Sequence, residues 1–152
     1  MPLQQITTAA SSRDLLQWQA LYRDYADFYK MPMDERGLNT VWAWIQDDKM
    51  DFEARVVKNE QGVLLGFMHF RSMPSPLRGV VIGFLDDLFV APEYRGSGVV
   101  QALFTELKVI SREREWQTVR WITATDNHRA RAVYDKIAST MDFVTYAMPV
   151  EL

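Results

Sequence analysis

The sequence contains no cysteine and only two histidines, His69 and His128, among its 152 residues. A chain without cysteine cannot form disulfides, use a thiolate nucleophile or bind a metal through sulfur. The two histidines are far apart in the sequence, so a histidine-rich metal site is not expected either. We therefore predict chemistry that needs no metal.

Long apolar runs and a large excess of one charge are also missing. No stretch approaches the ~20 apolar residues of a membrane span, and the first residues have no apolar core of a signal peptide. The 17 basic and 20 acidic side chains give a net charge of −3, which gives no support for nucleic-acid binding. These absences predict a cytoplasmic protein with neither a membrane nor a nucleic-acid partner.

Apolar residues make up 48% of the chain and aromatic residues 12%, so the chain is expected to fold. Its length suits one domain, residues 1–152, with a sizeable core. Ser11 and Asp14 resemble a capping box that starts a helix, which continues with helical periodicity to Phe28. A second short helix, capped by Asn39, is predicted over residues 41–45.

Strand patterns dominate the middle of the chain. A hairpin with its turn at 59–62 is predicted to join strands 52–58 and 63–71. A loop over 73–79 precedes a strand over 80–90. After that strand the pattern alternates between helix and strand, and the predicted elements are a helix over 99–114, a strand over 118–124, a helix from Asn127 and a final strand over 143–150. This order predicts a mixed sheet with helices on its faces.

The stretch from Phe84 to Leu103 combines an apolar strand, a glycine turn and a helix. Pro92 ends the strand, because proline cannot donate to a sheet ladder. The turn that follows precedes a helix start, where free backbone N–H groups and the helix dipole favour an anion. Arg95 can add a bidentate phosphate contact. A plain strand-to-helix turn explains the glycines about equally well.

The turn resembles a known loop. Its residues Arg95, Gly96, Ser97, Gly98, Val99 and Val100 are similar to the acetyl-CoA pyrophosphate loop of the GNAT superfamily of N-acetyltransferases, written Arg/Gln-x-x-Gly-x-Gly/Ala. Val100 departs from that pattern, which has a small residue there. The resemblance implies acetyl-CoA as cosubstrate, held by these six residues and by backbone groups of Leu88, Phe89 and Val90. It also implies the GNAT fold, an α/β (α+β mixed) fold with a mixed, mostly antiparallel twisted sheet flanked by helices.

A second motif begins at Asn127. Ala130 and Tyr134 are four residues apart and would share one helix face. The spacing Asn127, Ala130, Tyr134 resembles the GNAT signature Asn-x-x-Ala-x-x-x-Tyr. The resemblance implies that Asn127 and Ala130 border the pantetheine arm. It further implies that the Tyr134 hydroxyl protonates the leaving thiolate, as a general acid.

Two adjacent acids, Asp86 and Asp87, interrupt the apolar strand 84–90. Alternation along a strand predicts that their side chains point to opposite faces. The strand resembles the Leu-Glu-Asp strand of polyamine acetyltransferases and of the histone/polyamine and D-amino-acid acetyltransferase-like branch. The aromatic segment ending at Tyr29 resembles the early aromatic helix of the latter branch. The resemblance implies that Asp86 helps to deprotonate the amine. Asp87 and Tyr29 are candidate substrate-binding residues.

We therefore predict an N-acetyltransferase that acts on a primary amine of a small molecule, such as a polyamine or an amino acid, by direct attack in a ternary complex. A protein lysine or N-terminal acetyltransferase is a second hypothesis, and it would need an open groove. A non-catalytic acyl-CoA-binding module is a third, favoured only by Val100. The sequence leaves the oligomeric state open, and a homodimer is one option because such relatives are often dimers.

Overall fold

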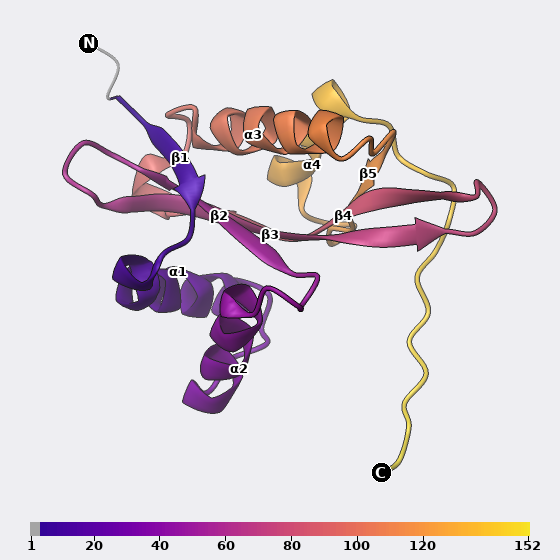
Figure 1. Ribbon diagram of the computed structural model, residues 1–152, viewed down its shortest axis with the longest axis horizontal. Coiled ribbons are helices and arrows are strands. Elements are labelled where there is room, and N and C mark those ends of the chain that lie inside the picture. The colour runs from indigo at the N-terminus through magenta and orange to yellow at the C-terminus, as the bar shows by residue number, and fades with distance from the viewer. Residues whose placement is uncertain (1–3) are drawn as a thin grey trace. The chain divides into compact units, whose positions relative to one another are not determined.

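The computed structural model describes residues 4–152. It contains two compact units, Met1–Trp121 and Ile122–Leu152 (Figure 1), which are described separately below. The first unit holds most of the secondary structure, and its elements in chain order are β1 (Ile6–Ala9), a 3-10 turn (Ser12–Asp14), α1 (Leu15–Phe28), α2 (Glu35–Gln46), β2 (Glu53–Lys58), β3 (Leu64–Ser75), β4 (Val80–Val90), a second 3-10 turn (Pro92–Tyr94), α3 (Val99–Glu113) and β5 (Val119–Arg120).

The five strands form one sheet in the order β1-β2-β3-β4-β5. The first four strands are antiparallel to their neighbours, and β5 pairs in parallel with β4. Figure 1 shows α1 and α2 on one face of this sheet and α3 on the other. The predicted mixed, mostly antiparallel sheet flanked by helices is therefore confirmed.

Apolar packing on both faces holds the helices against the sheet. On the face of α1 and α2, Trp18 and Leu38 are fully buried and pack around Phe67 of β3. On the other face, α3 buries residues at helical spacing, including Leu103 and Leu107. Each helix thus presents one apolar stripe to the sheet, as the sequence periodicity predicts.

Local signals placed the helix starts with mixed success. The capping box is present, because the backbone N–H of Ser11 donates to Asp14 Oδ2 at 2.8 Å. The second helix, however, starts at Glu35, because Asp34 accepts a hydrogen bond from the backbone N–H of Gly37 at 2.8 Å and caps the helix. Asn39 therefore lies inside α2, and the prediction that it caps this helix is wrong.

In the first unit, the strand predictions differ from the structure at β1, β3 and β5. Strand β1 was not predicted, although it pairs with β2 over four residues. Strand β3 continues to Ser75, through the predicted loop, while β5 is confined to Val119–Arg120.

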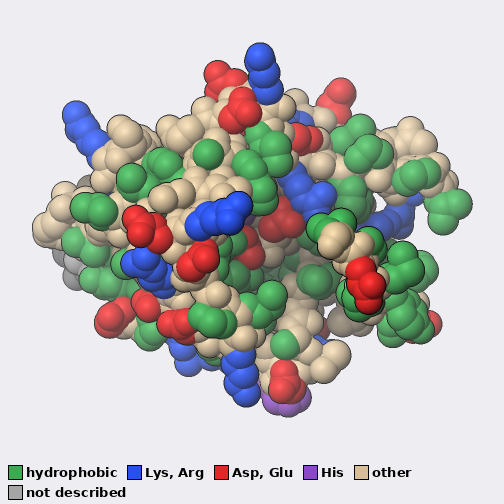
Figure 2. All heavy atoms as spheres, turned by 90° about the horizontal axis from the view of Figure 1, so that it is seen from below, with side chains coloured by type: hydrophobic (Ala, Val, Ile, Leu, Met, Phe, Trp, Pro, Cys, Tyr) green, Lys and Arg blue, Asp and Glu red, His purple; other side chains and the backbone are tan. Residues whose placement is uncertain are grey.

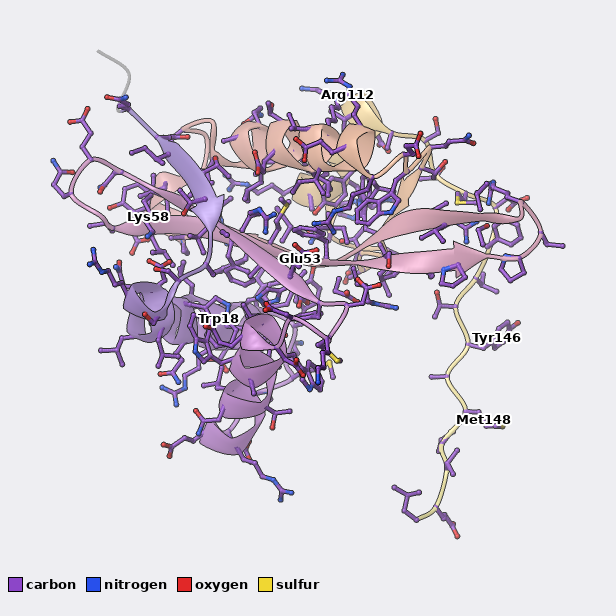
Figure 3. The ribbon with its side chains drawn as sticks, viewed as in Figure 1. Trp18, Glu53, Lys58, Arg112, Tyr146 and Met148 are labelled. Carbon is purple, nitrogen blue, oxygen red and sulfur yellow. The ribbon has the colours of Figure 1, made fainter. Side chains whose placement is uncertain are left out.

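The second unit contains one helix, α4 (His128–Ile137), and its residues 138–152 contain no helix or strand. The predicted final strand over 143–150 is therefore wrong in this structure. Its alternating pattern is real, but a strand also needs a hydrogen-bonded neighbour. Phe143 and Tyr146 are instead 82% and 90% exposed, and Figure 3 shows the side chain of Tyr146 on the extended tail.

Candidate active site

The centre of the candidate site is an irregularity in the pairing of β3 with β4. His69 lies opposite Asp87, but the next residue, Phe70, lies opposite Leu85. Asp86 is therefore the extra residue of a β-bulge, and a bulge interrupts the alternation of side chains along a strand. Bulges are over-represented beside active sites, where they redirect a side chain.

The bulge brings both carboxylates to the same face of the sheet. Asp86 accepts from Arg71 Nε, and Asp87 contacts His69 Nδ1. Residues two apart on a strand share one face, so Arg71 and His69 are on the same face of β3. The prediction that Asp86 and Asp87 point to opposite faces is therefore wrong, because it assumed a regular strand.

Asp87 is the better buried of the two acids, with 16% of its side chain exposed. Its Oδ2 lies 2.8 Å from His69 Nδ1 and accepts a hydrogen bond from the Tyr22 hydroxyl at 3.1 Å. A hydrogen bond from Tyr25 also reaches this carboxylate. Burial by itself would raise the pKa of Asp87, but the contacts with His69 and the two tyrosines outweigh it and lower the pKa. Asp87 is therefore a carboxylate at neutral pH.

Asp86 has a different environment. Arg71 Nε donates to its two oxygens at 3.0 and 3.3 Å, and the guanidinium lies over the Phe84 ring at 4.7 Å. Burial raises the pKa of Asp86 above its ordinary value, although Arg71 opposes this. A carboxylate whose pKa is raised is a better proton acceptor than one whose pKa is lowered. Of the two acids, Asp86 is the one suited to take up a proton.

Tyrosines from α1 and its C-terminal end line the same face. Tyr22 and Tyr25 of α1 and Tyr29, the residue after the helix, recur at helical spacing. The ring centroids are 5.8 Å apart for the first pair and 4.9 Å for the second. The Tyr25 ring also meets Phe89 of β4 edge-on at 5.7 Å. Burial, followed by the charge of Asp87, raises the pKa of both Tyr22 and Tyr25. These phenols therefore stay neutral and act as hydrogen-bond donors.

The glycine turn connects β4 to α3. Gly96 and Gly98 have φ values of +79° and +90°, which favour glycine. Nothing in the described structure lies within 4 Å of a Cβ built on either residue, so the space above the turn is open. The first bond of α3 runs from the N–H of Ala102 to the carbonyl of Gly98 at 3.0 Å. The N–H groups of Val99 and Val100 precede this bond and have no partner within the helix.

Side chains around the turn differ in their access to this space. Arg95 and Ser97 are exposed, and the guanidinium of Arg95 lies 5.8 Å from the centroid of the Phe89 ring. Ser97 donates its hydroxyl to the carbonyl of Tyr94, which holds the turn. Val99 is only 1% exposed and belongs to the core, so only its backbone can contact a ligand. Val100 is partly exposed.

The edge of β4 next to β5 is largely without a strand neighbour in the described chain. β5 pairs with β4 only opposite Gly83 and Phe84, before the two acids are reached. An unpaired strand edge offers N–H and C=O groups to a ligand. The side chains of Phe89 and Val90 are buried and that of Leu88 is partly exposed. Contacts from Leu88 to Val90 would thus come mainly from the backbone.

The remaining candidate residues belong to α4 in the second unit. Asn127 caps this helix, because its Oδ1 accepts from the backbone N–H of Ala130 at 3.3 Å, and its Nδ2 donates to Thr123 Oγ1 at 3.5 Å. Ala130 and Tyr134 lie one turn apart on the helix and are both partly exposed. The helix predicted from Asn127 is confirmed, and so is the shared face of Ala130 and Tyr134.

Sequence reasoning missed two residues of the first unit. Trp18 and His69 were not among the predicted site residues, yet both are 0% exposed and are hydrogen-bonded to each other at 2.9 Å. The only signal was a lone histidine in an apolar strand next to acids. A cavity of about 420 Å³, lined by residues 9–10, 45 and 47–55, contains none of the predicted site residues.

Two absences hold for residues 4–152. These residues contain no group of three or more histidine, aspartate or glutamate side chains that could hold a metal ion. None of their helices is long and apolar enough to cross a membrane. On the face shown in Figure 2, acidic and basic side chains are interspersed.

A glycine turn at a helix start and an open β4 edge offer backbone groups to an anionic ligand, and two carboxylates lie on the same mixed sheet. Residues 18–138 match the family described as acetyltransferase (GNAT) family. The chain belongs to this family and is an enzyme that uses acetyl-CoA as cosubstrate.

Individual relatives agree with this assignment. The chain is 27% identical to D-amino-acid N-acetyltransferase HPA3 of Saccharomyces cerevisiae over 142 residues, which cover 93% of this chain and 88% of the yeast protein.

Solved structures show the same fold. The ribosomal-protein-alanine N-acetyltransferase of Brucella melitensis biovar Abortus has a TM-score of 0.80 and 24% identity, with 97% of this chain and 99% of that one covered. The aminoglycoside 6'-N-acetyltransferase AAC(6')-Ih of Acinetobacter baumannii has a TM-score of 0.78 and 15% identity, with 98% and 99% covered. The names of these proteins cover different acceptors, so the fold alone does not define the substrate.

Proposed function

We propose that the protein transfers the acetyl group of acetyl-CoA to a primary amine of a small molecule, a polyamine or an amino acid. The observation that carries this proposal is Asp87, an ionised, largely buried carboxylate beside the tyrosines of α1. A carboxylate among aromatic rings suits an ammonium group, which both ion pairing and cation–π attraction favour. We assign Asp87 and Tyr29 to amine binding. The yeast relative, named for D-amino acids, supports a small acceptor.

The residues present fit acetyl-CoA. The open space above Gly96 and Gly98 admits a pyrophosphate close to the backbone, and the helix N-terminus favours its charge. Exposed Arg95 can add a charged hydrogen bond. We propose that the turn from Arg95 to Val100 holds the pyrophosphate, and that the backbone of Leu88, Phe89 and Val90 holds the pantetheine and polarises the acetyl carbonyl.

Acetyl-CoA supplies an activated acetyl group, so no covalent enzyme intermediate is needed. We propose that Asp86, directly or through water, takes one proton from the bound ammonium, and that the neutral amine nitrogen then forms the new C–N bond while the C–S bond breaks. Tyr134 gives its proton to the departing sulfur, and the second proton that the nitrogen loses restores the Tyr134 hydroxyl through solvent. Asn127 and Ala130 would border the pantetheine arm, as the family motif implies. Neither a covalent nor a metal-dependent step is part of this proposal.

The acceptor is the part of the proposal that an experiment decides most directly. The full-length protein is incubated with acetyl-CoA and released CoA is measured with polyamines, D- and L-amino acids, and lysine peptides. We expect turnover with small amines and little with peptides. Turnover only with peptides would instead support the protein lysine or N-terminal hypothesis. Acetyl-CoA binding without turnover of any amine would support the non-catalytic module.

The other expectations stay predictions. We propose a single domain over residues 1–152, because the family match over 18–138 crosses the boundary between the two units. A homodimer stays one option, and a cytoplasmic location is predicted from the sequence.

A further inference from the structure

A hydrogen bond from Trp18 fixes the protonation state of the His69 imidazole. Trp18 Nε1 lies 2.9 Å from His69 Nε2, and an indole N–H can only donate a hydrogen bond. His69 Nε2 must therefore be the unprotonated, accepting nitrogen. The single ring proton is on Nδ1, which donates to Asp87 Oδ2 at 2.8 Å. His69 in this geometry is neutral.

The ring has little freedom to rearrange. His69 is 0% exposed and is surrounded by the rings of Phe52, Phe67 and Tyr22, with centroids 4.8 to 5.2 Å away. Turning the ring over would place carbon atoms where both hydrogen bonds now form. Figure 3 shows Trp18 where α1 faces the sheet, so the donor comes from an element different from that of its acceptor.

The result is a carboxylate with no cationic partner. The ionisable groups that face His69 and Asp87 are Tyr22 and Tyr25 from α1, Asp86 from β4 and Arg71 from β3. The two phenols are neutral, and Arg71 is paired with Asp86. Among residues 4–152, His69 is the one basic side chain paired with Asp87. Its neutral state leaves the charge of Asp87 uncompensated, which is costly for a buried group.

We infer that Trp18 and His69 are positioning residues that keep Asp87 as an uncompensated anion, so that the ammonium group of the acceptor supplies the missing positive charge. This inference rests on the proposed function. A doubly protonated His69 would form an ion pair with Asp87 and would therefore compete with the ammonium group of the substrate for this carboxylate. The Trp18 N–H prevents this by occupying the only nitrogen that could accept the second proton.

The test is to remove the indole N–H and keep an aromatic ring. In Trp18→Phe, His69 Nε2 has lost its donor and is free to accept a second ring proton as the pH falls. The imidazolium should then pair with Asp87, and KM for the amine, relative to wild type at the same pH, should rise about tenfold to hundredfold from pH 8 to pH 5.5. For the KM of acetyl-CoA and for kcat, the ratio of the variant's value to the wild-type value should not change with pH. Dividing by wild type cancels the protonation of the amine itself.

A matched control makes the same tryptophan-to-phenylalanine change at a neighbouring residue of the same aromatic cluster. Trp42 of α2 packs against Trp18 with ring centroids 5.0 Å apart, so Trp42→Phe should disturb packing without freeing His69. Its KM ratio should be independent of pH. The double variant Trp18→Phe/His69→Gln keeps a neutral donor toward Asp87 and removes the titrating ring, so it should also lose the pH dependence. A pH-dependent ratio in the double variant would overturn the inference.

Nitrogen-15 NMR of the two histidines tests the inference without turnover and without relying on the folding of Trp18→Phe. His128→Gln leaves His69 as the single histidine. We expect its Nδ1 to be protonated and its Nε2 unprotonated from pH 5 to pH 8 in the wild-type cluster. Protonation of both His69 nitrogens within this pH range in the wild-type cluster would overturn the inference alone, and so would a flat KM ratio in Trp18→Phe when both nitrogens are protonated in that variant. Absence of turnover with every amine would instead contradict the proposed function.

Discussion

Asp86 and Asp87 are consecutive residues, yet Arg71 and His69 bind their carboxylates from the same face of β3. The bulge at Asp86 makes this arrangement possible. It places a carboxylate of raised pKa next to one of lowered pKa on one sheet face. Pairs of acids whose pKa values are moved apart are typical of sites where one group accepts a proton and the other stays charged.

The first prediction separates the roles of the two acids. Asp86→Asn should flatten the acid limb of the pH profile of kcat, because it removes the proposed proton acceptor. Asp87→Asn should keep that limb but raise KM for the amine about tenfold or more, because it removes the charge that binds ammonium. Initial rates from pH 5.5 to pH 9 measure both effects. An unchanged acid limb in both variants would assign deprotonation to bulk solvent.

A second prediction concerns Arg71. Its hydrogen bond and charge lower the pKa of Asp86, against the effect of burial. In Arg71→Gln the pKa of Asp86 should rise, so the acid limb of kcat should move to higher pH. The direction of this shift is the measured quantity. No shift, or a shift to lower pH, would remove Asp86 from the proton path.

Tyr134→Phe tests the proposed general acid. The change deletes one oxygen and keeps the ring, so the fold and acetyl-CoA binding should survive. A positioned general acid contributes about 10²–10⁴-fold, and the loss should appear in kcat with little change in KM, because the proton is needed only in the transition state. Steady-state kinetics check this split, and near-normal kcat would reject the acid role. Tyr146→Phe, on the exposed tail, is the control and should keep full activity.

The glycine turn is tested by calorimetry with acetyl-CoA. Gly98→Glu places a side chain and a negative charge in the space proposed for the pyrophosphate, so binding should be lost. Gly79→Glu is the matched control, because Gly79 also has a positive φ, of +65°, and open space around it, but lies in the β3–β4 turn. It should cost stability without changing affinity. Equal affinity in the two variants would place the cosubstrate elsewhere.

The tyrosines beside Asp87 predict sensitivity to alkali. Burial, and then the charge of Asp87, raises the pKa of Tyr22 and Tyr25. A group whose pKa is raised by folding contributes stability that is complete below its unfolded pKa, about 10 for tyrosine, and is lost as pH rises above it. Thermal unfolding should show Tm falling above about pH 10. Tyr25→Phe should fall less steeply with pH than wild type, and the exposed Tyr146→Phe should not differ from wild type. Identical slopes in all three would contradict the role of Tyr25.

The sequence by itself determined the parts of the protein that depend on local chemistry. The capping box at Ser11, the glycine turn at Gly96 to Gly98 and the helix from Asn127 follow from neighbouring residues. The order of strands and helices, together with these motifs, was enough to predict the GNAT fold. Local rules suffice here because helix caps, tight turns and helical periodicity depend on residues only a few positions apart in the sequence.

Only the tertiary structure decided how the candidate site is built. The bulge at Asp86 depends on the register against β3, which no local pattern reveals. The Trp18–His69 hydrogen bond joins residues 51 positions apart, and it changes a strand histidine into a fixed, neutral donor. The tail over 143–150 has the alternation of a strand but no pairing, because a strand forms only against a neighbour. Charge and protonation in this site are set by contacts between distant segments, and these exist only once the chain has folded.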